Sequence, residues 1–147
     1  MNKLTIPIDS IGIVIKTCYH ARQTPLLIGK PGIGKTEIVE QTAAELAAEL
    51  REYVHVRFLH AAGLAETDVR GYLIPVDEPS AVPPLPGQQR AVSKRAAFTK
   101  PEFWDDVERY PRGILFLDEF LQASPEVQKA MASLLLDRRI GEYVLPD

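Results

Sequence analysis

The most informative part of this sequence is a glycine-rich stretch that separates an apolar run from a long helical pattern. The run at 24–29 is short, apolar and closed by glycine, which predicts a buried strand. The pattern from Thr36 to about Glu52 repeats apolar residues at helical spacing, which predicts an amphipathic helix. A strand, a glycine-rich turn and a helix in this order predict an α/β fold. The stretch itself consists of Gly29, Lys30, Pro31, Gly32, Ile33, Gly34, Lys35 and Thr36.

The stretch 29–36 fits the pattern G-x-x-x-x-G-K-[ST] at every position. Its glycines let successive backbone N–H groups converge on phosphate oxygens, with the N-terminus of a helix behind them. Lys35 supplies a mobile positive charge for the β- and γ-phosphates, and Thr36 offers a hydroxyl group to Mg²⁺. We expect all eight residues and the adjoining Glu37 to contact the nucleotide. The alternative is a glycine-rich turn whose lysine is only solvated, which the strand-to-helix context disfavours.

A second candidate site follows the most apolar run of the chain. Residues 114–117 are Ile, Leu, Phe and Leu, and Asp118 and Glu119 come directly after them. This pattern predicts a strand in the centre of the sheet that delivers two carboxylates to its carboxyl edge, where open parallel sheets bind ligands. Asp118 is expected to hold Mg²⁺ through water, and Glu119 to polarise the attacking water as a general base. An acidic end to a buried strand, without function, is the alternative when this pattern stands alone.

The rest of the chain alternates helical and strand patterns, which favours a parallel sheet. We expect a helix within 6–22, a strand at 53–59, and a surface loop between Pro75 and Pro86, where five prolines exclude a helix or a central strand. Pro101 opens a short helix with Phe103, Trp104 and Val107 facing inward. Ser124 caps a helix from Pro125 to about Asp137 that Gly141 ends, and a further strand starts near residue 142.

Composition excludes several classes of protein. The 147 residues carry 17 Lys and Arg against 20 Asp and Glu, so the net charge of −3 excludes a globally basic nucleic-acid coat. One cysteine, Cys18, cannot form an internal disulfide, and no apolar stretch approaches a membrane span. The three histidines show no metal-ligand spacing. We therefore expect a cytoplasmic protein without a membrane partner, in which Arg90, Lys94, Arg95 and Lys100 form the only basic cluster.

Three segments together resemble the AAA+ superfamily of P-loop NTPases, and more narrowly its MoxR-like and dynein-related branch. They are the glycine-rich loop at 29–36, the segment 66–71 (Glu-Thr-Asp-Val-Arg-Gly), and the run 113–143 that contains Leu-Asp-Glu, a small residue, Pro and Val-Gln. The resemblance covers nearly the whole chain from about Pro7, with 75–98 as its loosest part. It implies a three-layer α/β sandwich with a mostly parallel sheet.

The resemblance also implies an activity and an assembly. Its members bind Mg²⁺ and ATP, hydrolyse the nucleotide and form rings, commonly hexamers, that remodel protein substrates. The loop 68–73, including Tyr72, is the candidate for a position at the ring pore; a plain surface loop is the alternative. Two other interpretations remain open: a nucleotide-gated binding module without efficient turnover, and a DNA-translocating or helicase-type motor that uses the basic cluster.

The resemblance further implies that parts of the module lie beyond this sequence. The sensor 1 residue, the arginine finger and the helical lid follow Asp147 in the family pattern, and so do the strands that flank 24–29. We therefore expect residues 1–147 to be part of an AAA+ nucleotide-binding domain with a proline-rich insertion at 75–98. The strands 24–29 and 114–118 are then not direct neighbours, the later strands and the lid are absent, and hydrolysis by the chain alone is slow.

Overall fold

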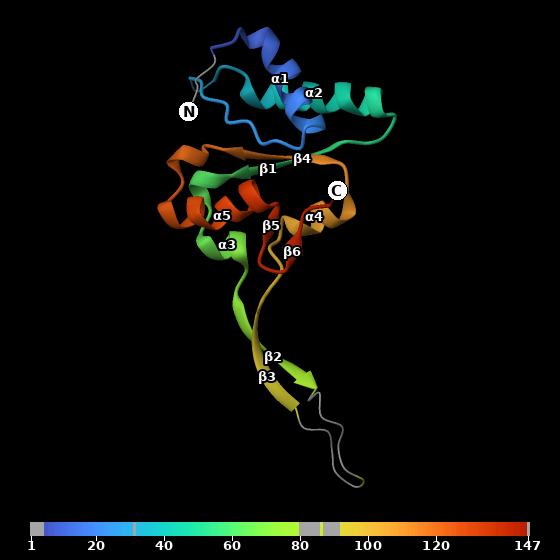
Figure 1. Cartoon of the computed structure of the whole chain (residues 1–147). Coiled ribbons are helices and arrows are strands. Elements are labelled where there is room, and N and C mark those ends of the chain that lie inside the picture. Colours follow the sequence, from blue (N-terminus) through green and yellow to red (C-terminus); the bar gives the residue numbers. More distant parts are fainter. Residues whose placement is uncertain (1–4, 31, 80–85, 87–91, 147) are drawn as a thin grey trace.

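Helices cover both faces of a small parallel sheet in this protein (Figure 1). A computed structural model describes residues 5–30, 32–79, 86 and 92–146. The helices are α1 (Ile11–His20), α2 (Lys35–Leu50), α3 (Glu66–Arg70), α4 (Trp104–Arg109) and α5 (Pro125–Asp137), with 3-10 turns η1 (Ile8–Ser10), η2 (Ala61–Gly63) and η3 (Phe120–Gln122). The strands are β1 (His55–His60), β2 (Leu73–Pro79), β3 (Val92–Phe98), β4 (Gly113–Asp118), β5 (Arg139–Ile140) and β6 (Tyr143–Val144). The three-layer α/β arrangement that the sequence predicts is confirmed.

The central sheet consists of β1 and β4, which pair in parallel with His55 opposite Gly113 and His60 opposite Asp118. Because side chains alternate along each strand, Val56 and Ile114 face α2, whereas Leu59 and its neighbours on β4 face α5. The carboxyl ends of both strands therefore meet at one edge of the sheet. The helix α2 runs in the opposite direction, so it begins on the side of the molecule where these strands end (Figure 1).

The larger core lies between the sheet and the helices α3, α4 and α5. Val69, Val127, Ala130 and Met131 are completely buried there, and Trp104 is 2% exposed. Ser124 caps α5 as expected, because its Oγ accepts a hydrogen bond of 3.3 Å from the Val127 N–H. The predicted helix 125–137 is confirmed, and so is the inward position of Phe103 and Trp104. The expected helix start at Pro101 is corrected, because α4 begins at Trp104.

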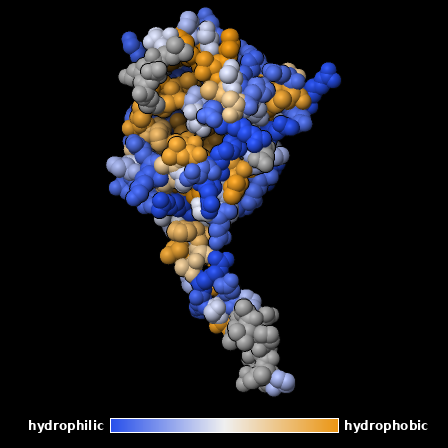
Figure 2. Space-filling view, in the orientation of Figure 1, coloured by the Kyte–Doolittle hydropathy of each residue, from blue (hydrophilic) through white to orange (hydrophobic). Residues whose placement is uncertain are grey.

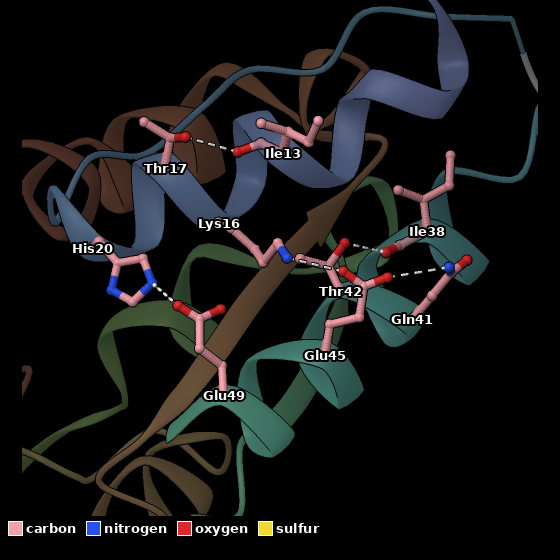
Figure 3. A network of polar contacts seen from close by, with 9 residues as sticks. All are labelled: Ile13, Lys16, Thr17, His20, Ile38, Gln41, Thr42, Glu45 and Glu49. Carbon is pink, nitrogen blue, oxygen red and sulfur yellow. Dashed lines mark hydrogen bonds and ion pairs between the residues drawn. The ribbon is translucent and has the colours of Figure 1, made fainter. Parts of the chain in front are cut away.

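The helices α1 and α2 pack closely and are joined by ion pairs (Figure 3). Lys16 lies 3.1 Å from Glu45 and His20 lies 3.3 Å from Glu49. Hydrogen bonds from Lys16 and from Gln41 lower the pKa of Glu45 below its ordinary value. Gly12 lies close to α2, since a Cβ atom there would lie 3.2 Å from the Thr42 Oγ1. The contact with α2 therefore leaves little room for a side chain larger than that of glycine at this position.

Replacing Gly12 with alanine is expected to destabilise the protein by about 1 kcal/mol. Alanine gains about 1 kcal/mol of helix propensity, but overpacking a filled site costs about 1–3 kcal/mol. Thr42 is 2% exposed and its hydroxyl donates a 2.6 Å hydrogen bond to the Ile38 carbonyl, so it cannot move aside freely. Urea denaturation of Gly12→Ala in the wild-type and in a Thr42→Ala background checks this. The change should become stabilising in the second background, and stabilisation in both would contradict the steric explanation.

The strands β2 and β3 form an antiparallel ribbon that projects away from the rest of the molecule (Figure 1). This corrects the expected loop between Pro75 and Pro86, because residues 73–79 are a strand that contains two prolines. A two-stranded ribbon has only edge strands, and proline is tolerated on an edge when its nitrogen faces outward. Residues 80–85 and 87–91 lie outside the described part of the chain.

Two further expectations are corrected by the strand pairing. The run 24–29 forms no strand, and Leu26 and Ile28 are 44% and 65% exposed. Within the described residues β4 pairs with β1 alone, so it is not the centre of a larger sheet. An apolar run gains the ladder hydrogen bonds of a strand only beside a partner, and no described strand lies beside 24–29.

The C-terminal residues form a short hairpin. Helix α5 ends at Asp137, and the following residue, Arg138, adopts a left-handed conformation with φ 56°. The sequence predicts that Gly141 ends this helix. That prediction is wrong, because Gly141 lies in the turn between β5 and β6. The expected strand near residue 142 is confirmed by β6. None of the described helices is long and apolar enough to cross a membrane.

Candidate functional site

The glycine-rich loop leads directly into α2, and its glycines adopt conformations that other residues avoid. Gly32 has φ 71° and Gly34 has φ 85°, both in the left-handed region. A Cβ atom on Gly32 would meet nothing within 4 Å, so the backbone conformation and not the available space requires glycine there. Pro31 lies outside the described residues. Together these dihedral angles turn the chain sharply into the helix.

The N-terminus of α2 supplies the positive end of a long helix to this loop. Gly34 precedes the helix and provides no side-chain cap, and the Ile38 N–H makes the first helical bond, 3.1 Å, to the Gly34 carbonyl. The amides of Lys35, Thr36 and Glu37 have no acceptor within the helix, because the first turn lacks preceding carbonyls. They carry the partial positive charge of the helix dipole, which favours an anion.

The ammonium group of Lys35 lies over the loop. Its Nζ donates to the carbonyls of Lys30 at 3.1 Å and Gly29 at 3.4 Å. A phosphate oxygen forms a stronger, charge-assisted hydrogen bond with an ammonium group than a carbonyl does, so a bound phosphate can replace these two carbonyls. Lys35 is thus poised at the position where the loop and the helix N-terminus both favour negative charge.

The two acids lie at the carboxyl edge of the β1–β4 sheet. Asp118 is the last residue of β4, and its Oδ1 accepts a 2.9 Å hydrogen bond from the Glu119 N–H. Glu119 has φ 52°, which is uncommon for a residue with a side chain, and it starts the η3 turn.

His60 contacts Glu119, and the sequence did not reveal this. Its Nε2 lies 3.2 Å from the Glu119 Oε2, with both side chains partly exposed. The expected strand at 53–59 leaves His60 just beyond its end, and the spacing of the three histidines indicates no metal site. The structure extends β1 by one residue and pairs His60 with Asp118. Because β1 and β4 are parallel neighbours, the residues at their carboxyl ends lie side by side. Pairing these two strands from the sequence is the step that could have predicted the contact between His60 and Glu119.

The loop and the acids share one side of the molecule but do not contact each other directly. The loop precedes α2 on the side where β1 and β4 end (Figure 1). Among the described residues, no hydrogen bond or ion pair joins Lys35 or Thr36 to Asp118 or Glu119. The same residues contain no cluster of three His, Cys, Asp or Glu side chains that could hold a metal by itself. A metal here would need ligands from outside the chain, such as phosphate oxygens and water.

The residues present fit magnesium and a triphosphate chemically. Thr36 is exposed and Asp118 is half-buried, and both offer the hard oxygen atoms that Mg²⁺ prefers. Mg²⁺ is usually bound by one or two protein ligands together with phosphates and water, so a large protein cage is not required. The ammonium of Lys35 and the free amides of the α2 N-terminus match the charge of the phosphates.

The segment 66–71 is held by specific contacts at the root of the β2–β3 ribbon. The Asp68 carboxylate accepts a 2.8 Å hydrogen bond from the Ala65 N–H, and Arg70 lies 3.0 Å from Glu66. Gly71 has φ 81°, and a Cβ atom there would lie 1.8 Å from the Thr99 carbonyl oxygen. Only glycine fits this position. Tyr72 follows with 61% of its surface exposed. The expected loop at 68–73 is corrected, because residues 68–70 belong to α3 and residue 73 starts β2.

The basic cluster is largely neutralised by neighbouring acids. Lys100 lies 2.9 Å from Glu108 and also contacts Asp105, and these carboxylates raise its pKa. Arg95 lies 3.4 Å from Glu142 and 3.8 Å from Glu78. Lys94 makes no ion pair with any residue that the structure describes, and Arg90 falls outside them. This pairing weighs against a nucleic-acid surface formed by all four residues.

Comparison with known proteins identifies the family. Residues 25–144 match the family model of the AAA domain, dynein-related subfamily. Searches of curated proteins and of solved structures gave no match. The matched region contains the glycine-rich loop, the segment 66–71 and both acids, and it covers most of the chain. The chain therefore belongs to the dynein-related subfamily of AAA domains, whose activity is of the AAA+ ATPase type.

Proposed function

We propose that this protein binds ATP with Mg²⁺ and hydrolyses it, as a MoxR-like AAA+ ATPase. The observation that carries the proposal is the geometry of residues 29–30 and 32–36. Two glycines with positive φ lead into α2, and the Lys35 ammonium lies over the same loop. The loop leads into α2, and α2 begins on the side of the molecule where β1 ends in His60 and β4 ends in Asp118.

Each predicted site residue receives a role in this proposal. The backbone of 29–36, the first amides of α2 and the Lys35 ammonium bind the phosphates. Thr36 and Asp118 hold Mg²⁺, which neutralises phosphate charge when it is bound. Glu119 accepts a proton from the attacking water as a general base. Glu37 in the first turn of α2 stays close to the same phosphates.

The proposed assembly is a homo-oligomeric ring, commonly a hexamer, that remodels a protein substrate. The exposed Tyr72 at the root of the ribbon supports a contact with that substrate, because an exposed aromatic side chain on a constrained loop suits a binding role. A group from a neighbouring subunit would then complete the active site. In P-loop enzymes a trans-acting arginine raises the rate by about 10³–10⁵, so the isolated chain is expected to turn over slowly.

One observation favours the second candidate, a nucleotide-gated module without efficient turnover. The Glu119 carboxylate is engaged by His60 at 3.2 Å. A carboxylate held by a neighbouring imidazole is less available to a water molecule. In this alternative the bound nucleotide orders a binding surface, and hydrolysis is incidental.

Removal of magnesium tests the proposed site. Titration of the whole chain with ATP in the presence of Mg²⁺, and again with EDTA, should show affinity at least about tenfold higher with the metal. Asp118→Asn should remove most of this difference, because it weakens the metal ligand without changing the shape of the side chain. Asp77→Asn on the ribbon is the matched control and should behave as wild type. Tight binding that ignores both EDTA and Asp118→Asn would contradict the proposed metal site.

A further inference from the structure

The β2–β3 ribbon leaves the rest of the molecule, here called the body, through a tightly held root formed by Gly71, Tyr72 and Thr99. The Thr99 N–H donates a 2.8 Å hydrogen bond to the Tyr72 carbonyl, and the Tyr72 N–H donates one of 2.8 Å to the Thr99 hydroxyl. Gly71 lies against the Thr99 carbonyl with no room for a Cβ atom. The two strands are therefore fixed to each other at the root, and the ribbon changes its orientation as one unit.

The two faces of the ribbon differ in burial. Arg95 lies opposite Val76 in the register, and Ala97 lies on the same face two residues further along β3. Val76 and Ala97 are half-buried, whereas every other residue of β2 and β3 is exposed. Figure 2 shows the ribbon standing clear of the body along most of its length. Because the two half-buried side chains are small, the burial of apolar surface holds the ribbon in place only weakly.

A single ion pair joins the two ribbon strands to the body in the described part of the chain. The Arg95 Nη1 lies 3.4 Å from the Oε1 of Glu142, which belongs to the β5–β6 turn. Phe98 and Tyr143 line a shallow pocket beside this pair, but Phe98 remains 50% exposed, so its contact with the turn is loose. The ion pair is therefore the main polar contact that holds the ribbon to the body beyond the root.

Arg95 has a second acidic partner within the ribbon itself. Its Nε lies 3.8 Å from the Oε2 of Glu78 on β2, so one guanidinium group lies between an acid of the ribbon and an acid of the body. If the ribbon bends away from the body, Arg95 keeps Glu78, and Glu142, whose side chain is 79% exposed, is hydrated. An exposed ion pair changes an equilibrium by a factor of about 1.5–5. Separation of this pair is therefore easily reversible.

We propose that Arg95 and Glu142 form an electrostatic latch that holds the β2–β3 ribbon against the β5–β6 turn. When the pair is formed, the ribbon keeps the orientation seen in the structure. When the pair is broken, the ribbon bends away from the body above its root, because few buried apolar contacts oppose this motion. Salt weakens the latch, since both side chains are solvent-accessible. The latch does not depend on the nucleotide site.

The distance between a label on the ribbon and a label on the body tests this proposal. The whole chain with Cys18→Ser, Asp77→Cys and Lys129→Cys carries nitroxide labels at two exposed positions, one on β2 and one on α5. Double electron–electron resonance measures the distribution of label distances at about 0.05 M and about 0.5 M NaCl. Low salt should give one main distance, and high salt should raise the ratio of a second, different distance to the first at least about twofold.

The two acids beside Arg95 provide a matched pair of variants. Glu142→Gln removes the acid of the body and should raise the ratio of bent to held ribbon about two- to fivefold at low salt. Glu78→Gln removes the acid of the ribbon, leaves the latch in place, and should keep this ratio unchanged or lower it. Arg95→Gln combined with Glu142→Gln should have no larger effect than Glu142→Gln alone, because both changes break the same pair.

A distance distribution that neither salt nor Glu142→Gln changes would overturn the latch, and so would an equal effect of Glu78→Gln. Hydrogen exchange of the Thr99 amide checks that the root of the ribbon stays intact in each sample. If Glu142→Gln exposes this amide to exchange, the salt dependence of the chain with Glu142 in place decides the question. These distances are measured without nucleotide, so their outcome bears on the latch alone, and titration of the same chain with ATP and Mg²⁺ tests the proposed ATPase separately.

Discussion

Lys35→Ala is expected to weaken the binding of ATP in the presence of Mg²⁺ by at least about 30-fold. A charge-assisted hydrogen bond contributes about 1.5–3 kcal/mol, and Lys35 is expected to contact two phosphates. The fold should not change, because the only described partners of its ammonium are the carbonyls of Gly29 and Lys30 in the loop itself. Isothermal titration of the variant and the wild-type chain measures the loss directly, and thermal unfolding confirms that both samples are folded.

Lys30→Ala is the matched control for this experiment. It removes the same charge from the same loop and leaves the backbone of the loop in place. General electrostatic attraction between ATP and the loop would weaken equally in both variants. A specific phosphate contact predicts a large loss for Lys35→Ala and a change below about threefold for Lys30→Ala, since an exposed charge contributes little. Equal losses would contradict the proposed role of Lys35.

Local patterns predicted most of the helices and the glycine-rich turn that leads into α2. The start of the helix 125–137 was predictable to the residue, because a serine cap and a proline in the first turn precede a continuous apolar face there. The loop at 29–36 was recognisable because its glycines answer a backbone requirement, now visible as positive φ at Gly32 and Gly34. In both cases the information lies within a few neighbouring residues.

The features that the sequence did not predict depend on distant partners. The apolar composition of 24–29 favours a strand, but a strand also needs a neighbour, and none lies beside it among the described residues. The prolines of 75–79 appeared to exclude a strand, because their tolerance depends on a register with β3 that local sequence does not contain. The contact between His60 and Glu119 likewise depends on the pairing of β1 with β4.

Glu119→Gln is expected to lower the rate of ATP hydrolysis by about 10²–10⁴-fold and to leave ATP affinity within about twofold of wild type. Glutamine retains the shape of the side chain and can still form a hydrogen bond with His60, so the turn at φ 52° and its contact persist. Only the ability to accept a proton from water is lost. Phosphate release under single-turnover conditions, with protein in excess over ATP, measures this effect even when turnover is slow.

The same variant decides between the two proposed functions when His60→Ala is measured beside it. For an ATPase that uses Glu119 as its base, Glu119→Gln abolishes phosphate release, whereas His60→Ala retains it, because releasing the carboxylate from the imidazole leaves it free to act on water. For a nucleotide-gated module, both variants release phosphate at the low rate of the wild-type chain, and Lys35→Ala alone alters nucleotide-dependent behaviour. Glu126→Gln, an equivalent change in the first turn of α5, should leave every rate unchanged. A Glu119→Gln variant that hydrolyses ATP as fast as wild type would exclude Glu119 as the general base.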